Sequence, residues 1–122
     1  MVYNDIKINT DGQLEYVEGS DQLYTGSSQT YYENGNPQHV GQYEDGLMEG
    51  LWVYYYENGK VYAKIPFLLG LTNGLTETFY EDGTPQLKGH SKNGVRDGIW
   101  TTYKVDGTLE REEHYIDGEI VN

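Results

Sequence analysis

Glycines recur along this chain in three series that share one period of 24 residues. The first series is Gly35, Gly59, Gly83 and Gly107, and the other two begin at Gly26 and Gly46. The stretches that end in the first series align without gaps as SSQTYYENG, LWVYYYENG, LTETFYEDG and IWTTYKVDG. A fixed period of this length is typical of proteins in which one small supersecondary unit is stacked on the next. The chain is therefore expected to contain about four copies of one unit.

Each unit has the sequence pattern of a β-hairpin. Asn-Gly or Asp-Gly follows a run of Tyr, Thr, Val and Trp, and such a pair favours a two-residue type I′ turn with positive φ at both positions. We therefore expect positive φ at Gly59 and Gly83. The segments GLMEG, GLTNG and GVRDG are predicted to be the loops that join one hairpin to the next. No window has a helical period, so the prediction is an all-β fold, an elongated single-layer antiparallel meander of 24-residue β-hairpin repeats with about ten strands.

The domain organisation follows from the same period. One repeat domain is expected over residues 1–122, with about four repeats in residues 26–122. Residues 1–25 form either a divergent N-terminal unit, with its turn at TDG (10–12), or a cap on the sheet. Two-residue turns would place Glu57 opposite Lys60 and Glu77 opposite Lys88, and opposite charges in such positions are mildly stabilising.

The aromatic residues fall into columns at matching repeat positions. One column is Tyr31, Tyr55, Phe79 and Tyr103, and the adjacent column is Tyr32, Tyr56 and Tyr80, followed by Lys104. Neighbouring residues of a strand face opposite sides, so an aromatic ladder is predicted on each face of the sheet. Packing along a sheet that has no second layer is one interpretation, because a Tyr ring can be partly buried while its hydroxyl stays wet. An exposed aromatic binding face is the other.

The charge of the chain restricts its partners. The net charge is -12, and residues 1–60 contain ten acids but two bases, Lys7 and Lys60. Such a surface repels nucleic acids and anionic membranes, so neither is expected as a partner. A basic protein is favoured on the same grounds. The 13 Tyr residues argue against disorder.

The sequence also suggests a location. There is no Cys, which fits a reducing compartment. The first residues, MVYNDIKINTDG, lack the features of a signal peptide. The longest apolar run, IPFLLGL (65–71), is too short to cross a bilayer. A cytoplasmic protein is expected, and an exported protein with a trimmed leader is the alternative.

No set of residues in the chain predicts catalysis, a metal or a cofactor. Ser27, Ser28, Ser91 and His90 occupy ordinary repeat positions, without the base and orienting acid that a nucleophile requires. His90 and His114 are equivalent residues of successive repeats, about 10 Å apart, which is too far for a shared metal. We expect no enzymatic activity, no cofactor and no metal site.

The repeats resemble a known family. The stretches YYENGNPQHVGQYEDGLMEGLW (31–52), YYENGK (55–60), FYEDGTPQLKGHSKNGVRDGIW (79–100) and YIDG (115–118) are similar to the MORN repeat, in the variant form of the bacterial YwqK-type antitoxin proteins. The resemblance implies a non-catalytic protein-binding module of the antitoxin or immunity kind, which covers a basic effector. A structural or self-assembling repeat scaffold is the alternative. Lipid-associated members of the family use basic residues near the repeats, and residues 8–59 contain none.

Nine residues are candidates for partner binding because they are aromatic or apolar at repeat positions. They are Tyr31, Trp52, Tyr55, Ile65, Phe67, Leu68, Phe79, Trp100 and Tyr103. Trp52 and Trp100 are equivalent to each other and serve either as packing residues or as binding anchors.

Residues 65–69 depart from the repeat. Ile65, Phe67 and Leu68 replace the polar or small residues of VGQYE (40–44) and KGHSK (88–92). Pro66 is predicted to end or bulge its strand, because it lacks a backbone donor. The segment VYNDIKI (2–8), a second copy of the chain or a foreign partner would cover the apolar residues. We favour a homodimer through residues 65–69, because a symmetric dimer is the commonest way to bury one patch.

Overall fold

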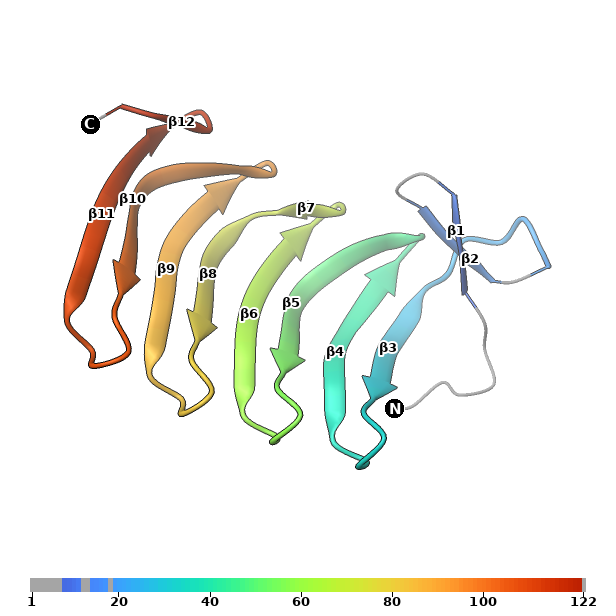
Figure 1. Ribbon diagram of the computed structural model, residues 1–122. Coiled ribbons are helices and arrows are strands. Elements are labelled where there is room, and N and C mark those ends of the chain that lie inside the picture. The colour runs from blue at the N-terminus through green and yellow to red at the C-terminus, as the bar shows by residue number, and fades with distance from the viewer. Residues whose placement is uncertain (1–7, 12–13, 18, 122) are drawn as a thin grey trace.

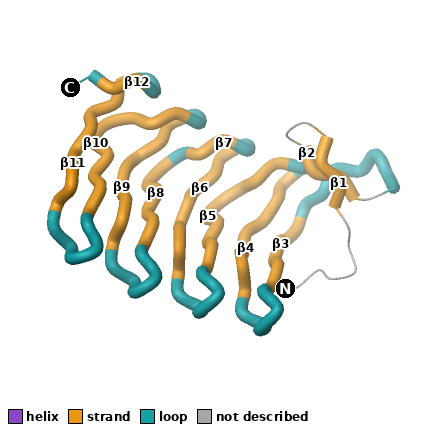
Figure 2. Tube along the Cα trace, viewed as in Figure 1, coloured by secondary structure: helices purple, strands orange, loops and turns teal. Residues whose placement is uncertain are grey.

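The computed structural model describes residues 8–11, 14–17 and 19–121, and these residues form strands and turns without any helix (Figure 2). The strands are β1 (Ile8–Asp11), β2 (Leu14–Val17), β3 (Gly26–Tyr31), β4 (Pro37–Glu44), β5 (Leu47–Tyr55), β6 (Val61–Leu68), β7 (Leu71–Thr72), β8 (Gly74–Phe79), β9 (Pro85–Lys92), β10 (Val95–Tyr103), β11 (Leu109–Ile116) and β12 (Glu119–Ile120).

The strands follow one another across an antiparallel meander, as the sequence predicts. The main sheet has the order β12-β11-β10-β9-β8-β6-β5-β4-β3, and β7 pairs with β6. Figure 1 shows this sheet as a single layer of strands that curve along their length. β1 and β2 form a separate two-stranded sheet, which lies beside the β3–β4 end of the main sheet in Figure 1. Backbone hydrogen bonds from Glu15 to Gly46 and from Tyr24 to Glu15 connect the two sheets.

The Asn-Gly turns differ from the prediction. Positive φ is confirmed at Gly59, at 90°, but Asn58 is not in this region, so the predicted type I′ turn is wrong. The Gly59 N–H donates to the Tyr56 carbonyl at 3.0 Å, and the Tyr56 N–H donates to the Lys60 carbonyl at 2.8 Å. The hairpin therefore has a three-residue loop with a bulge at its glycine. Asn58 Oδ1 accepts the Lys60 N–H at 2.9 Å and closes this wider loop.

The wider loop changes one of the two predicted charge pairs. Glu57 lies in the loop, and the last pair of β5 with β6 is Tyr55 with Val61, so the predicted Glu57–Lys60 pair is wrong. Glu77 and Lys88 are direct partners of β8 and β9, as predicted. Gly83 has φ 94°, also as predicted.

Type I′ geometry occurs at the opposite edge of the sheet. Asp45 and Gly46 have φ of 49° and 81°, and the same pair of positive φ values recurs at residues 69–70, 93–94 and 117–118. The prediction that GLMEG is a loop is therefore wrong. Its first residue, Gly46, is the second residue of the turn, and the rest of the segment belongs to β5. The same correction applies to GVRDG, which enters β10, whereas GLTNG enters β7 and reaches β8.

Glycine bulges bend the strands that follow these turns. The register of β4 with β5 shifts between Val40 and Gln42, and the register of β9 with β10 shifts between Asp97 and Thr101. Gly50 and Gly98 lie at these shifts, with φ of 73° and 79°. A bulge increases the local bend and twist of a strand, which accounts for the curved strands of Figure 1.

Hydrogen bonds connect successive repeats along both edges of the sheet. The hydroxyls of Tyr32, Tyr56 and Tyr80 each donate, at 2.7 Å, to a backbone carbonyl of the next repeat. At the other edge, the N–H groups of Gly46, Gly70, Gly94 and Gly118 donate to carbonyls of the preceding repeat. The predicted second aromatic ladder is therefore wrong, because the tyrosines of that column join neighbouring hairpins at the loop edge.

The core lies on one face of the sheet, which we call the packed face. Its buried residues are Tyr24, Trp52, Ala63, Thr76, Ser91, Trp100 and Tyr115. The opposite side is the outer face. Gly41 and Gly89 lie directly under the tryptophans of the packed face: an added Cβ would come within 2.2 Å of the Trp52 ring at Gly41 and 2.1 Å of the Trp100 ring at Gly89. Only glycine leaves room for these rings.

The departure at residues 65–69 stays within the sheet. β6 runs through Pro66 to Leu68, so the prediction that the strand ends or bulges at Pro66 is wrong. The Pro66 carbonyl accepts the Asn73 N–H at 3.0 Å. In an antiparallel sheet the N–H and C=O of one residue point to the same neighbouring strand. The N–H that Pro66 lacks would thus face the break between β7 and β8, where the sheet does not require it. Ile65 occupies the repeat position of Gly41, and Thr76 occupies that of Trp52. The larger Ile65 therefore accompanies the smaller Thr76 in this unit.

Candidate protein-binding surface

The structure separates the nine predicted binding residues between the two faces of the sheet. Direct partners across antiparallel strands share a face, so the pairing of Trp52 with Ile65 places both on the packed face. Phe67 contacts the Trp52 ring there, and Trp100 covers Gly89 on the same face. The outer face carries the remaining five residues, which are Tyr31, Tyr55, Leu68, Phe79 and Tyr103.

The two tryptophans are core residues. Trp52 is 2% exposed and Trp100 is 4% exposed. The Trp52 Nε1 donates to the Gln42 carbonyl at 3.1 Å, and the Trp100 Nε1 donates to the His90 carbonyl at 2.8 Å. Their indole groups have neither free surface nor a free donor. We therefore assign both to packing, and the interpretation of Trp52 and Trp100 as binding anchors loses its basis.

Burial also perturbs the groups around Trp52. The His39 ring stacks on Trp52 with a centroid distance of 5.2 Å, and burial lowers the pKa of His39 below its usual 6.5. The Tyr43 ring lies edge-on to Trp52 at 5.1 Å, and burial raises the pKa of Tyr43 to about 12. Both side chains are thus neutral at pH 7, and the packed face around Trp52 is an uncharged aromatic cluster.

The outer-face column consists of Tyr31, Tyr55, Phe79 and Tyr103, the last residues of β3, β5, β8 and β10. Tyr31 is 43% exposed, and the other three side chains are partly exposed. The Tyr31 hydroxyl donates to Gln29 at 2.6 Å. Lys64 Nζ lies 6.0 Å from the centre of the Phe79 ring. This column is a periodic aromatic surface that is partly exposed in all four repeats.

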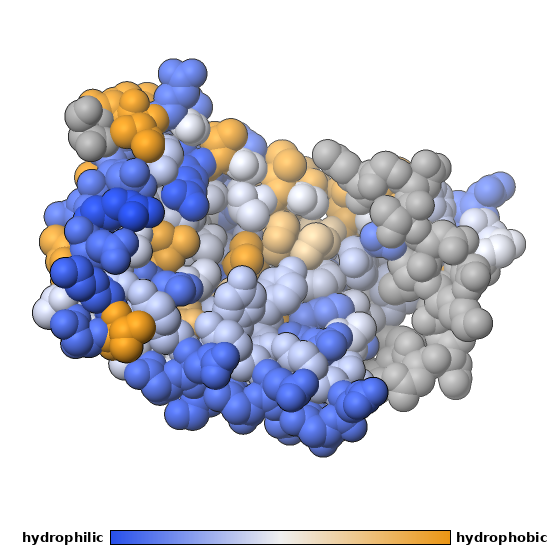
Figure 3. Space-filling view, in the orientation of Figure 1, coloured by the Kyte–Doolittle hydropathy of each residue, from blue (hydrophilic) through white to orange (hydrophobic). Residues whose placement is uncertain are grey.

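Acidic loops border this column. Three of the four hairpin loops expose a carboxylate two residues beyond the column, at Glu33, Glu57 and Glu81, and the fourth has Val105 at this position. Figure 3 shows strongly hydrophilic residues along the margin that holds these loops, and paler residues in the hollow above it. Hydrogen bonds from Thr84 hold the pKa of Asp82 below its usual range, and hydrogen bonds from Thr108 do the same for Asp106.

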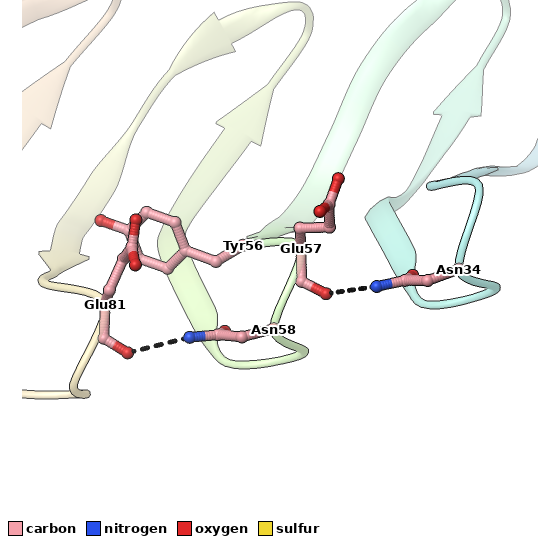
Figure 4. Close-up of a pocket in the computed structure, with 5 residues that line it drawn as sticks. All are labelled: Asn34, Tyr56, Glu57, Asn58 and Glu81. Atoms are coloured by element: carbon pink, nitrogen blue, oxygen red, sulfur yellow. Dashed lines mark hydrogen bonds between the residues drawn. The ribbon is translucent and has the colours of Figure 1, made fainter.

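A cavity of about 360 Å³ lies along three successive hairpin loops, lined by Asn34 of the first, Tyr56, Glu57 and Asn58 of the second, and Glu81 of the third. Asn34 Nδ2 donates to the Glu57 carbonyl at 2.9 Å, and Asn58 Nδ2 donates to the Glu81 carbonyl at 3.2 Å (Figure 4). This site was not predicted from the sequence. The available signal was the series YENG (32–35), YENG (56–59) and YEDG (80–83), which repeats an acid and an amide or acid in neighbouring loops.

Within the described residues, the carboxylates of the hairpin loops form no ion pair, although, besides the hydrogen bonds from Thr84, the charge of Lys60 contributes to the lowered pKa of Asp82. The two ion pairs found among the described residues both involve Arg111, with Glu110 at 3.2 Å and Glu113 at 3.6 Å. Lys60 Nζ donates to the backbone carbonyl of Asp82, at 3.4 Å. The loop edge is therefore an acidic surface that can attract an external cation. No group of three metal-ligating side chains occurs in the described part of the chain.

Exposed aliphatic residues form a second feature of the outer face. Leu68 is 47% exposed and Leu69 at the adjoining turn is 68% exposed. Ile65 and Phe67 are partly buried on the packed face, so residues 65–69 do not form one exposed patch as predicted. Leu51 and Ile99, at 52% and 50%, were missed. Leu51, Leu75 and Ile99 are 24 residues apart, and each follows a glycine. This aliphatic column was the sequence signal that could have predicted the exposure of Leu51 and Ile99.

These features define a class of protein, a single-layer β-hairpin repeat protein with one packed face and one open face. A family model for the MORN repeat variant matches residues 24–45, 48–68, 72–93 and 96–117. The matches cover more than half of the chain, which therefore belongs to the MORN repeat variant family. Searches of curated proteins and of solved structures give no significant match. Repeat proteins of this kind present extended surfaces for binding.

None of the described residues belongs to a helix long and apolar enough to cross a membrane.

Proposed function

We propose that this chain is a non-catalytic protein-binding module of the antitoxin or immunity kind, and that its partner is a basic effector protein. One observation carries the proposal: a partly exposed aromatic column on the outer face lies beside acidic loops whose carboxylates form no ion pair among the described residues. Aromatic residues supply most of the binding energy in many protein interfaces. Complementary charge increases the rate of encounter and excludes partners of the wrong sign.

Affinity capture from the source cell tests the proposal, with a bait pair that differs only on the outer face. The wild-type chain should retain a basic protein, and Tyr55→Ala with Phe79→Ala should lose it. The matched control is Ile116→Ala, an exposed apolar residue of β11 away from the column. A small toxic gene next to the gene for this chain would supply a candidate to purify. Failure of the wild-type chain to retain any basic protein would contradict the proposal.

The salt dependence of the purified complex gives a second test. The association rate should fall steeply as ionic strength rises, because exposed charges are screened beyond ~8 Å at physiological salt. Glu57→Gln with Glu81→Gln should reduce both the rate and its salt dependence. Glu112→Gln with Glu119→Gln is the charge-matched control, on exposed residues of β11 and β12. An association rate that does not change with salt would mean that the acidic loops do not recognise the partner.

A self-assembling scaffold is the second candidate, favoured by the exposed leucines around the turn at residues 69–70. Leu68 and Leu71 are direct partners of β6 and β7, and both are exposed. Leu68→Asp with Leu71→Asp should convert an assembly to monomers in light scattering while circular dichroism stays unchanged. Two copies of a chain with charge -12 repel each other, so assembly should increase with salt, opposite to binding of a basic partner. A wild-type chain that is monomeric at all concentrations excludes this candidate.

A further inference from the structure

The outer-face column of Tyr31, Tyr55, Phe79 and Tyr103 has a spacing that matches one kind of peptide backbone. Members of the column are two strands apart, which corresponds to about 9.6 Å. A polyproline II helix completes one turn in three residues and ~9.3 Å. Over the three intervals of the column, the two spacings differ by about 1 Å in total. Every third residue of such a peptide would therefore lie at the same place relative to successive aromatic rings of the column.

Other peptide backbones fit the column less well. An α-helix presents equivalent side chains every seven residues, ~10.5 Å apart, so the mismatch grows to about 3 Å over the column. A β-strand also advances about 10 Å in three residues, but residues three apart point to opposite faces of the strand. Only the threefold backbone keeps both the spacing and the direction of its side chains.

The hydroxyl groups of the column supply hydrogen-bond donors for such a backbone. Neither the Tyr55 nor the Tyr103 hydroxyl has a hydrogen-bond partner within the described ranges, and both side chains are partly exposed. A polyproline II helix has no internal hydrogen bonds, so its carbonyls are open to external donors. Proline-rich segments bind to aromatic-lined grooves in other proteins for these reasons.

The cavity between the hairpin loops adds a site for a cation. Tyr56, which lines the cavity, directly follows Tyr55 of the column, and Glu57 and Glu81 line it as well (Figure 4). Within the strands, Lys64 already lies over the Phe79 ring. A basic side chain of a ligand is therefore directed to the carboxylates of the loops rather than to the strands.

We propose that the outer face binds a proline-rich segment in the polyproline II conformation, with an adjacent arginine or lysine in the cavity between Glu57 and Glu81. This inference rests on the proposed function and specifies the part of a basic partner that the column would recognise. The binding energy comes from the aromatic rings and the hydroxyls, and the charge selects peptides with a flanking basic residue.

A titration calorimetry experiment with three synthetic peptides of equal length and charge tests the proposal. The first peptide has prolines at every third position and two terminal arginines. The second places the same arginines on an alanine-rich helix, and the third places them on a glycine-serine chain. The full-length chain should bind the proline-rich peptide at least tenfold more tightly than either of the others. Equal affinities would show that charge alone drives binding and would overturn the proposal.

Variants of the chain locate the binding site. Tyr55→Ala with Phe79→Ala should weaken binding of the proline-rich peptide at least tenfold, and Glu57→Gln with Glu81→Gln should weaken it about threefold to tenfold. Tyr55→Phe removes the hydroxyl alone and should weaken binding about threefold, which keeps the test valid if the double alanine variant does not fold. Ile116→Ala and Glu112→Gln should bind as the wild type does. Unchanged affinity in the column variants would overturn the proposal.

A competition experiment separates this inference from the proposed function. If a basic partner binds the chain and the proline-rich peptide does not compete with it, the protein-binding function stands and the polyproline inference is wrong. If the peptide binds but no basic protein is ever captured, the column recognises polyproline and the antitoxin or immunity function fails.

Discussion

The surroundings of Trp52 and Trp100 differ although the two residues occupy equivalent positions two repeats apart. Trp52 contacts the rings of His39, Tyr43, Tyr54 and Phe67. The corresponding residues near Trp100 are Leu87, Ser91, Thr102 and Tyr115. The backbone of the repeat is the same in both places, so the difference lies entirely in the side chains that cover each indole.

Arg96 compensates for the smaller residues around Trp100. Its guanidinium lies 4.2 Å from the centre of the Trp100 ring and donates to the Tyr115 hydroxyl at 3.1 Å. Arg96 is the direct partner of Ser91, which replaces the bulky Tyr43 of the first site. A cation above an indole is attracted by the negative face of the ring. The same repeat thus holds one tryptophan by aromatic packing and the other by a cation.

The largest effect should come from removing each tryptophan. Trp52→Ala should lower the free energy of unfolding by about 4 kcal/mol and Trp100→Ala by about 3 kcal/mol, because Trp52 loses contacts to four rings. Urea denaturation of both variants measures the difference. If Trp100→Ala is the more damaging variant, the cation site contributes more than the aromatic cluster and the comparison above is wrong.

Substitution of the glycines under the rings should have the next largest effect. Gly41→Ala and Gly89→Ala place a Cβ far inside contact distance of Trp52 and Trp100. Overpacking of this kind costs about 1–3 kcal/mol. We expect the higher value at Gly41, because four aromatic neighbours prevent Trp52 from moving, whereas the flexible Arg96 gives way beside Trp100.

A control separates this clash from backbone strain. Gly35→Ala meets no atom within 4 Å but has φ 91°, so its cost reports strain alone. Neither Gly41 nor Gly89 has positive φ. Thermal unfolding of the three variants gives the two effects separately, and wild-type stability of Gly41→Ala would contradict the observed contact with Trp52.

Replacement of Arg96 should have a smaller effect. Arg96→Met introduces the type of residue that the first site has at Met48, and it removes the cation while keeping an apolar stem. The expected loss is about 1 kcal/mol in urea denaturation, from the cation and its hydrogen bond. Arg111→Met is the control, because its ion pairs are exposed and should contribute about 0.5 kcal/mol or less. An equal loss in both variants would show that Arg96 acts as an ordinary surface charge.

The smallest effect should be a dependence on pH that belongs to the Trp52 site alone. Burial lowers the pKa of His39 in the folded chain, so the unfolded chain binds the proton more readily. The stabilisation from neutral His39 is complete above pH 6.5 and is lost as the pH falls below this value. The equivalent residue near Trp100 is Leu87, which does not titrate.

Tryptophan fluorescence measures this difference. In a Trp100→Phe background, Trp52 reports the urea midpoint of unfolding. As the pH is lowered from 6.5, this midpoint should fall more steeply with His39 present than in the same background with His39→Gln. Many carboxylates titrate in the lower part of this range in both chains, so the comparison isolates His39. Identical slopes would mean that His39 is protonated as easily in the folded chain as in the unfolded chain.

Half of the candidate site could be predicted from the sequence. The column of Tyr31, Tyr55, Phe79 and Tyr103 was found because residues one repeat apart lie in register across the sheet. Trp52 and Trp100 were candidates for packing or for binding, and their burial favours packing. Residues 65–69 divide between the two faces and do not form one patch. Sequence periodicity shows which residues are equivalent, but it does not show which face of the sheet a column occupies.

The sequence by itself determined the repeat, the meander, the positive φ at Gly59 and Gly83, and the pairing of Glu77 with Lys88. These features depend on contacts between residues near in sequence or exactly one repeat apart. The tertiary structure decided the turn type at each edge, the face of each column and the burial of the tryptophans. The physical reason is that the repeat period shows which residues are equivalent, whereas turn type and burial depend on contacts between neighbouring strands. At the bulges, residues 50–52 lie opposite Gly41 and residues 98–100 lie opposite Gly89, and this register lets each tryptophan ring cover a glycine.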